Sequence, residues 1–305
     1  MLLVVAGPTA SGKSLLALSL ACTLGGEIVN ADSQQLYRDL PILSALPSVE
    51  DFQRIPHHLY GIFPFEEPCS VGKWCSLAET CLSEIHQRQH LPILVGGTGL
   101  YLKAFLEGLR SIPQIPPAVR QEVRERFVFL GKADFWQELC TLDPLAATHV
   151  RPTDTQRLQR AYEVMRATGR SLFSWMQETP QRSVCIVIIL PPREDLYTAC
   201  NTRFALFLER GALEEVRTIL HDLPPSLHAQ IKTIGFQELR QYLEGKISLE
   251  EAVLLAQQHT RQYAKRQITW FRHQLTAHHI IPYRITAECL PETCTSLVPL
   301  LNEWV

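Results

Sequence analysis

A glycine-rich turn near the start of the chain limits its possible folds more than any other feature. Residues 7–14 read G-P-T-A-S-G-K-S, which satisfies the phosphate-loop pattern G-x-x-x-x-G-K-[ST]. An apolar run at residues 2–6, typical of a strand buried on both faces, precedes the turn, and a segment with helical periodicity follows it up to residue 24. This order of strand, loop and helix predicts a parallel α/β fold that binds a diphosphate or a triphosphate.

The loop also predicts which groups would hold the anion. Backbone N–H groups would converge on phosphate oxygens at the N-terminus of the helix. The ammonium group of Lys13 would add a positive charge, and the Ser14 hydroxyl is suited to bind Mg²⁺, the predicted cofactor. The predicted diphosphate-binding residues are Gly7, Pro8, Thr9, Ala10, Ser11, Gly12, Lys13 and Ser14.

The strands that follow argue against an ATP-driven motor. Motor and switch enzymes help to hold Mg²⁺ with an Asp at the end of a second buried strand. Here the candidate strand at residues 92–95 is followed by two glycines and Thr98, with no acid. The available strand-end carboxylate is Asp32, which follows a short strand predicted at residues 27–30. These features leave a kinase or another group-transfer enzyme.

Proline residues mark the main division of the chain. A proline-rich stretch at 112–117 precedes a helical, arginine-rich block, after which an apolar strand at 184–190 returns to the sheet. We therefore predict a P-loop α/β catalytic core, with a parallel sheet flanked by helices, at residues 1–117 and 180–305. The block at residues 118–179 is predicted to be an α-helical insertion domain.

Positive charge is concentrated in one region, although the formal net charge is only -2. A long helix is predicted at about residues 248–273, and no Asp or Glu occurs between residues 252 and 287. Arg261, Lys265 and Arg272 would lie on one face of this helix. Such a face can follow the phosphate backbone of a nucleic acid, or it can be the solvated side of an ordinary amphipathic helix.

The nine cysteines form neither a metal-binding nor a disulfide pattern. Their number is odd and no two are spaced as C-x-x-C, so we expect reduced thiols and a cytoplasmic protein. No apolar run approaches the roughly 20 residues that a bilayer-spanning helix needs, so no membrane segment is expected. A monomer is the default expectation.

Six segments of the sequence resemble the tRNA dimethylallyltransferases of the bacterial type in their order and spacing. They are residues 7–14, 31–38, 94–101, 154–161, 234–239 and 260–272. The last segment, T-R-Q-Y-A-K-R-Q-I-T-W-F-R, is the longest and the most specific. The resemblance therefore extends over nearly the whole chain.

This resemblance implies an activity and a set of catalytic residues. The family transfers the dimethylallyl group of dimethylallyl diphosphate to the N6 amine of the adenosine 3′-adjacent to the anticodon in tRNA, and releases diphosphate. The matching residues imply that Asp32 accepts the amine proton as the C–N bond forms. Lys13, Thr98 and Arg203 would stabilise the diphosphate leaving group.

The resemblance also implies a surface for the tRNA anticodon stem-loop. The helical insertion would clamp the stem-loop, and the target base would leave its stack to reach the donor. Gln34 and Gln35 would read the edge of that base. The implied tRNA-binding residues are Asp32, Ser33, Gln34, Gln35, Thr98, Arg120, Gln156, Arg157, Leu158, Gln159, Arg160, Arg261, Lys265, Arg266 and Arg272.

The chain departs from the family pattern at three places. The family's D-I-G-T-A-K-P stretch reads P-I-L-S-A-L-P at residues 41–47, and its L-I-D-I stretch has Gly61 in place of the acid. Ala199 stands where the family has the first Arg of R-x-x-x-R, which leaves only Arg203. Each change removes a charged or flexible group near the expected donor or tRNA, and so bears on donor affinity, tRNA choice and rate.

Three other functions compete with tRNA prenylation. An adenylate isopentenyltransferase would act on free adenine nucleotides, but the basic helix and the arginine-rich insertion favour an RNA substrate. A P-loop small-molecule kinase would use ATP, which the missing strand-end acid and the whole-chain resemblance disfavour. A non-catalytic RNA-binding relative is suggested only by the altered segment at 41–47.

Overall fold

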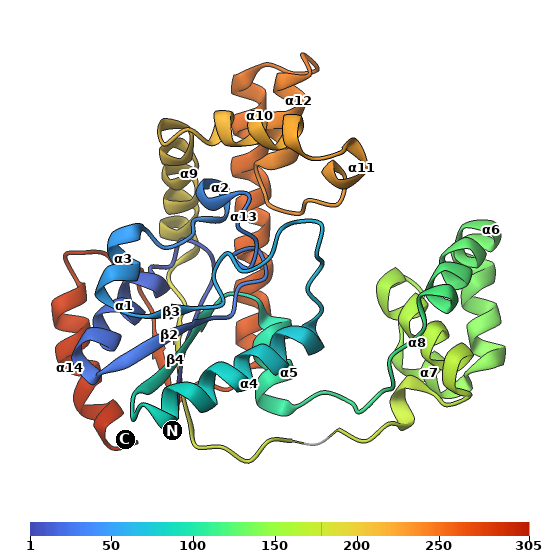
Figure 1. The fold of residues 1–305 in the computed structure, drawn as a ribbon, viewed down its shortest axis with the longest axis horizontal. Coiled ribbons are helices and arrows are strands. Elements are labelled where there is room, and N and C mark those ends of the chain that lie inside the picture. The colour runs from blue at the N-terminus through green and yellow to red at the C-terminus, as the bar shows by residue number, and fades with distance from the viewer. Residues whose placement is uncertain (178, 305) are drawn as a thin grey trace. The chain divides into compact units, whose positions relative to one another are not determined.

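The protein is described by a computed structural model that covers residues 1–177 and 179–304. The chain forms two compact units (Figure 1). The first unit combines residues 1–105 with 181–305, and the second contains residues 106–180.

A six-stranded sheet forms the centre of the first unit. The strands are ordered β3-β2-β4-β1-β5-β6, and every neighbouring pair is parallel. The predicted parallel α/β fold is therefore confirmed. The strands are β1 (Leu2–Ala6), β2 (Gly26–Asn30), β3 (His57–His58), β4 (Leu91–Gly96), β5 (Val184–Ile189) and β6 (His279–Ile281).

The central strands are buried on both faces, as their continuous apolar sequences predict. All residues of β1 are buried, and its last residue, Ala6, is paired with Gly96 of β4 and with Ile188 of β5. Parallel strands finish at the same edge of a sheet, where ligands of such folds bind. The loops after β1, β2 and β4 therefore meet at this edge.

One apolar core lies between the sheet and the helices that cover it. Helix α1 begins at the phosphate loop and ends at Gly25, whose left-handed backbone (φ 63°) closes the helix. It packs against β2, β4 and α14, and Leu16, Leu20 and Leu297 are buried between these elements. The helices of this part are α1 (Lys13–Leu24), α3 (Val49–Arg54), α4 (Val71–Gln87), α5 (Gly99–Glu107) and α14 (Leu290–Asn302).

A second apolar core lies among the helices between β5 and β6, together with α2. The long helix α13 packs against α9 and α12, and Phe204, Phe236 and Leu43 are buried among them. The predicted long helix is confirmed, and the hydroxyl of its N-cap Ser248 accepts a hydrogen bond from the Glu251 amide at 3.1 Å. The helices of this part are α2 (Pro41–Ser44), α9 (Arg193–Glu209), α10 (Ala212–Asp222), α11 (Pro225–His228), α12 (Phe236–Leu243) and α13 (Leu249–Gln274).

The second unit is helical and has its own core around Phe135 and Tyr162. The left-handed backbone of Gly131 (φ 72°) interrupts α6. The proline-rich stretch groups with this unit, so its boundary precedes the sequence-based boundary at residue 118. Among the described helices of the chain, none combines the length and apolar character that a membrane crossing requires. The elements of the unit are α6 (Pro117–Leu142), α7 (Pro144–His149), α8 (Thr155–Thr168) and the 3₁₀ turn η1 (Leu172–Ser174).

Candidate active site

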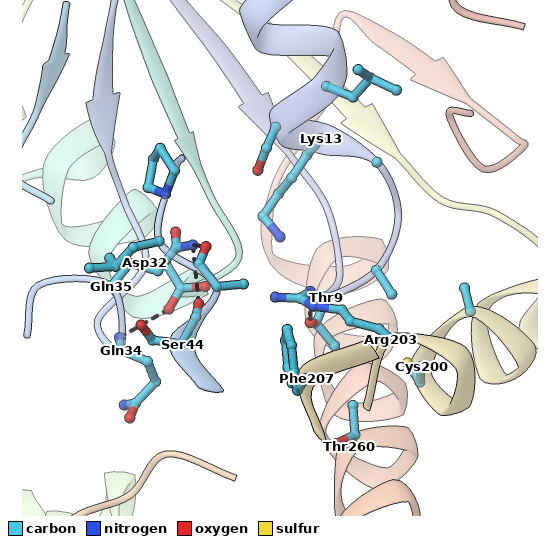
Figure 2. Close-up of a pocket in the computed structure, with 18 of the residues that line it drawn as sticks. Thr9, Lys13, Asp32, Gln34, Gln35, Ser44, Cys200, Arg203, Phe207 and Thr260 are labelled. Carbon is cyan, nitrogen blue, oxygen red and sulfur yellow. Dashed lines mark hydrogen bonds between the residues drawn. The ribbon is translucent and has the colours of Figure 1, made fainter. Parts of the chain in front are cut away.

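A cavity of about 1260 Å³ opens where the parallel strands end. Its wall contains residues of the phosphate loop, the segment after β2, helices α9 and α13, and the segment after β6. Figure 2 shows the side chains of Lys13, Asp32 and Arg203 approaching this space from different walls. Because ligands of parallel α/β proteins bind at this edge of the sheet, the cavity is the candidate active site.

The phosphate loop is shaped by a glycine and held on its outer side by the segment after β6. Gly12 has a left-handed backbone (φ 89°), and a Cβ there would lie 2.2 Å from the carbonyl oxygen of Ile285. The Ile285 amide donates to the carbonyl oxygen of Ser11 at 2.9 Å. Arg284 Nε donates to the carbonyl oxygen of Ala10 at 3.0 Å. These contacts fix the loop against a segment more than 270 residues away in the chain.

Two cations face the cavity beside the loop. Burial lowers the pKa of Lys13 to about 8, although the nearby Asp32 carboxylate favours the charged form. Arg203 of α9 donates from Nη1 to the Thr9 hydroxyl at 2.9 Å, and burial lowers the pKa of its guanidinium. Positive groups that have lost part of their hydration attract an anion strongly. This wall of the cavity therefore suits a diphosphate.

Asp32 is held by a buried asparagine at the end of β2. Asn30 Oδ1 accepts from the Asp32 amide at 2.7 Å, and Asn30 Nδ2 donates to the carbonyl oxygens of Asp32 and Leu59, both at 3.0 Å. Trp74 Nε1 in turn donates to the Asn30 carbonyl oxygen at 2.9 Å. The Asp32 carboxylate accepts from the Gln34 amide at 3.0 Å. The Asn30 side chain therefore fixes the backbone of Asp32 at the cavity wall, and the Gln34 amide holds the carboxylate.

Thr98 is bound to the turn that carries Asp32. Its Oγ1 accepts a hydrogen bond from the Ser33 amide at 2.9 Å and lies 3.3 Å from Ser33 Oγ. Ser33 lines the cavity, whereas Thr98 is not among the described residues of the cavity wall. The sequence implied a contact between Thr98 and the diphosphate; in the structure its hydroxyl is placed to hold Ser33.

The side-chain amides of Gln34 and Gln35 are also engaged. Gln34 Oε1 accepts from the Thr233 hydroxyl at 3.1 Å, and Gln35 Nε2 donates to the carbonyl oxygen of Ala45 at 2.6 Å. Both glutamines line the cavity. The turn after β2 is thus joined to two other walls of the cavity.

Two of the three places that depart from the family pattern lie on the cavity wall, whereas Gly61 is not among its described lining residues. The second half of the altered segment at 41–47 lines the cavity, as does Ala199 of α9. The Glu215 carboxylate accepts from the amides of Ile42 at 2.6 Å and Leu43 at 3.0 Å. The altered segment is therefore an ordered wall of mainly apolar side chains.

The basic residues of α13 divide between interior and surface. Arg261 is half-buried and donates from Nη1 to Asn201 Oδ1 at 2.7 Å. Lys265, Arg266 and Arg272 are exposed, and Arg266 also lines the cavity. The exposed positive charge of the helix therefore extends to the cavity.

The residues of the second unit that the sequence assigned to tRNA binding are not equally exposed. Those with exposed side chains are Arg120, Gln156 and Arg157. Gln159 is half-buried, and Arg160 Nη1 pairs with the Glu163 carboxylate at 3.1 Å. The Leu158 side chain is wholly buried in the core of this unit. Leu158 therefore packs α8 and presents no side chain to a partner.

The Ser14 hydroxyl is the side chain at the phosphate loop that could hold a magnesium ion. Ser14 is exposed in the first turn of α1 and lines the cavity. Within residues 1–177 and 179–304, no group of three or more His, Cys, Asp or Glu side chains forms a metal site. Mg²⁺ commonly keeps several waters and binds few protein oxygens together with substrate phosphates. The Ser14 hydroxyl is the fitting ligand.

Sequence reasoning missed the inward face of α13. Thr260 and Tyr263 line the cavity, and Gln267 is buried. Burial also raises the pKa of Tyr263. These positions are separated by three and four residues and so lie on one face of a helix. That spacing could have indicated a shared face toward the cavity. It was missed because polar side chains in a basic helix are more typical of a solvated face.

Known proteins resemble this chain over most of its length. A family model described as IPP transferase matches residues 35–274. The tRNA dimethylallyltransferase of Rhodospirillum rubrum is 48% identical over 296 residues, which cover 95% of this chain and 89% of that protein. The tRNA dimethylallyltransferase of Parvibaculum lavamentivorans is 48% identical over 278 residues, covering 90% of this chain and 88% of that protein.

Two solved structures share the fold. The full-length tRNA isopentenylpyrophosphate transferase from Bacillus halodurans has a TM-score of 0.69 at 30% identity, covering 99% of this chain and 97% of that one. A eukaryotic dimethylallyltransferase, in crystallographic snapshots of that enzyme acting on tRNA, has a TM-score of 0.75 at 29% identity, covering 88% of this chain and 69% of that one. The family model, the sequence identity and the shared fold agree, and the chain belongs to the IPP transferase family.

Proposed function

We propose that the protein transfers the dimethylallyl group of dimethylallyl diphosphate to the N6 amine of the adenosine 3′-adjacent to the anticodon in tRNA. Diphosphate is the other product. The observation that carries this proposal is one cavity that has Lys13 and Arg203 on its walls together with Asp32. The reaction needs such a combination, because cations must receive the leaving group while a carboxylate takes a proton from the attacking amine.

The adenine amine is a weak nucleophile, because its lone pair is delocalised into the ring. As the bond between N6 and the first carbon of the prenyl group forms, the bond from that carbon to the diphosphate oxygen breaks. The amine then loses a proton, and the Asp32 carboxylate accepts it. The hydrogen bond from the Gln34 amide to the Asp32 carboxylate, and that from the Asp32 amide to Asn30 Oδ1, keep the acceptor in place.

Negative charge develops on the departing diphosphate oxygen. The Lys13 ammonium and Arg203 guanidinium, with the amides of the phosphate loop, stabilise this charge in place of water. When bound at the Ser14 hydroxyl, Mg²⁺ would neutralise further charge on the diphosphate. The intact loop is thus explained without ATP hydrolysis.

The tRNA substrate requires positive charge outside the cavity and a base that leaves its stack. Lys265 and Arg272 are exposed on α13, and Arg157 is exposed on α8 of the second unit. These residues would bind phosphates of the anticodon stem-loop. The target adenosine would be flipped into the cavity, where Gln34 and Gln35 line the wall beside Asp32.

The test of this function is a transfer assay with a labelled prenyl group. The protein is mixed with dimethylallyl diphosphate labelled in the dimethylallyl group, Mg²⁺, and either tRNA or AMP. We expect label in tRNA and, after nuclease digestion, in the adenosine 3′ of the anticodon. Label in AMP would instead identify an adenylate isopentenyltransferase, and RNA binding without transfer would identify a non-catalytic relative.

A parallel assay addresses the kinase alternative. ATP labelled in its γ-phosphate is supplied with small-molecule acceptors, and we expect no phosphorylated product. We also expect the protein to be a monomer. We expect it in the cytoplasm, where free thiols such as its nine cysteines stay reduced. Size-exclusion chromatography with light scattering tests the oligomeric state.

A further inference from the structure

A buried glutamine of α13 joins two loops at the edge of the sheet where the cavity lies. Gln267 has only 5% of its surface exposed. Its Oε1 accepts a hydrogen bond from the Thr9 amide of the phosphate loop at 2.8 Å, and its Nε2 donates to the carbonyl oxygen of Gly97 at 2.8 Å. The two partners belong to loops after different strands, β1 and β4.

Helix α13 lies so close to the loop after β4 that residues larger than glycine are excluded at positions 97 and 99. A Cβ at Gly97 would lie 2.4 Å from Gln267 Nε2 and 3.0 Å from the Gly7 carbonyl oxygen. A Cβ at Gly99 would lie 2.3 Å from the Trp270 ring. Gln267 and Trp270 are one helical turn apart, so the same face of α13 touches the loop at both glycines. The amide bonds of Gln267 are therefore part of a tightly packed contact.

Each partner of Gln267 leads to a group used in the proposed reaction. On one side, the hydroxyl of Thr9 accepts from Arg203, which faces the leaving group. On the other side, Gly97 precedes Thr98, which binds Ser33 next to Asp32. A single side chain thus connects the wall that would hold the diphosphate with the wall that carries the proton acceptor.

We propose that Gln267 is a positioning residue that sets the distance between the diphosphate and Asp32. This inference rests on the proposed prenyl transfer. A glutamine amide supplies one acceptor and one donor in a fixed geometry, which matches one N–H and one carbonyl group. Methionine has a similar length and can supply neither bond at comparable strength.

The test compares Gln267→Met with a matched variant of the same helix, Gln257→Met. Gln257 Nε2 donates to the Asn201 carbonyl oxygen at 3.3 Å, so its replacement also removes a bond between α13 and another element. For each variant, the fraction of folded protein, kcat, KM for the donor and the Kd for tRNA are measured well below the melting temperature. The Kd for inorganic diphosphate with Mg²⁺ is measured by calorimetry.

For Gln267→Met we expect kcat per folded molecule to fall about 10- to 100-fold, because small displacements of reacting groups have effects of this size. Diphosphate affinity should fall about fivefold or more, because the loop loses a fixed amide, while the Kd for tRNA stays within about threefold. Gln257→Met should keep the wild-type kcat. Gln267→Glu keeps the bond from the Thr9 amide but loses the donor to the Gly97 carbonyl oxygen. Its kcat and diphosphate affinity should lie between those of the wild type and Gln267→Met. It replaces the methionine variant in the test if that variant does not fold.

Wild-type kcat and diphosphate affinity in Gln267→Met, with only a lower melting temperature, would overturn the inference and leave a structural role. A loss of tRNA affinity at unchanged kcat would also overturn it. If the wild-type protein transferred no prenyl group, the proposed function would fail, and the diphosphate measurement alone would still decide whether Gln267 positions the loop.

Discussion

Two carboxylates, one within strand β2 and one just beyond its end, have very different surroundings. Glu27, near the start of the strand, is 1% exposed. It is bound by Arg88 Nη2 at 2.7 Å and by ring nitrogens of His58 and His90, both at 2.6 Å. Asp32, two residues beyond the end of the strand, is held through backbone and amide groups and lines the cavity. The chain thus places one carboxylate within the strand, enclosed by Arg88 and two histidines, and another just beyond the strand, open to a cavity.

The difference shows how the ligands of a carboxylate decide its role. The hydrogen bonds from the Arg88 guanidinium are the main reason that the pKa of Glu27 falls to about 2, against the opposing effect of burial. A carboxylate stabilised in this way is a poor proton acceptor and a good anchor between strands. The positive charges of Lys13 and Arg203 interact with the Asp32 carboxylate through space, without a hydrogen bond to it. Its hydrogen bonds fix its position, and the cavity gives access to a substrate.

Removing the carboxylate that faces the cavity should have the largest effect on turnover. We expect Asp32→Asn to lower kcat about 10²- to 10⁴-fold, because a general base is lost. The Kd for tRNA should stay within a few-fold, and stability should change little, since the Asn side chain can still accept from the Gln34 amide. Single-turnover transfer and filter binding measure both quantities. Normal turnover in this variant would rule out Asp32 as the proton acceptor.

The opposite result is expected for the enclosed carboxylate. We expect Glu27→Gln to lower the free energy of unfolding by about 2–3 kcal/mol near pH 7. The loss is smaller than for a fully buried ion pair, because Arg88 and His90 are nearly half exposed. The folded-state pKa lies below the ordinary value, so this stabilisation is present above about pH 4.5 and is lost as the pH falls toward 2. Urea unfolding at several pH values measures it.

Turnover gives the control for this variant. Measured per folded molecule at low temperature, Glu27→Gln should keep the wild-type kcat, because Glu27 does not line the cavity. A loss of turnover as large as that of Asp32→Asn would abolish the distinction between the two carboxylates. Equal stability of wild type and variant would show that the bonds from Arg88, His58 and His90 to the Glu27 carboxylate contribute no net stabilisation.

The neighbours of the two carboxylates should also differ in how they titrate. Arg88 keeps its charge at any working pH, whereas the pKa of Lys13 is lowered to about 8. The ammonium is present below this value and is lost as the pH rises through it, so kcat/KM for the donor should fall above pH 8. The fall should approach about tenfold per pH unit. In Lys13→Arg the fall of kcat/KM above pH 8 should disappear, even if the rate is lower. If kcat/KM of the variant fell with pH as in the wild type, the fall would belong to another group.

The sequence predicted the parts of this comparison that depend on local pattern. Continuous apolar runs indicated β1, β4 and β5, and the phosphate-loop motif placed α1 correctly. The position of Asp32 just after a strand was also apparent. Strands β3 and β6 were not predicted, because two and three residues are too few to carry a periodic signal. They are strands only by virtue of their pairing with β2 and β5.

The hydrogen-bond partners that position the site residues could not be predicted from local sequence patterns. Gln267 bonds to Thr9 across 258 positions of the chain, and Ser33 bonds to Thr98 across 65. Such pairs follow from the packing of α13 and β4 against the phosphate loop, which no spacing in the sequence encodes. Thr98 depends on packing in the same way, because its hydroxyl accepts a hydrogen bond from the Ser33 amide, a partner that no spacing in the sequence indicates.

Two cations of the second unit differ in how firmly an ion pair holds them, although both side chains are exposed. Arg157 has 73% of its side chain exposed, whereas Arg126 binds both oxygens of Glu138 at 2.7 and 2.8 Å. We expect Arg157→Ala to weaken tRNA binding a few-fold and to lower the slope of log K against log salt by roughly 0.7–0.9, as one lost phosphate contact does. Arg126→Ala should leave that slope unchanged. Filter binding at several salt concentrations measures both, and equal slopes for the two variants would remove Arg157 from the RNA interface.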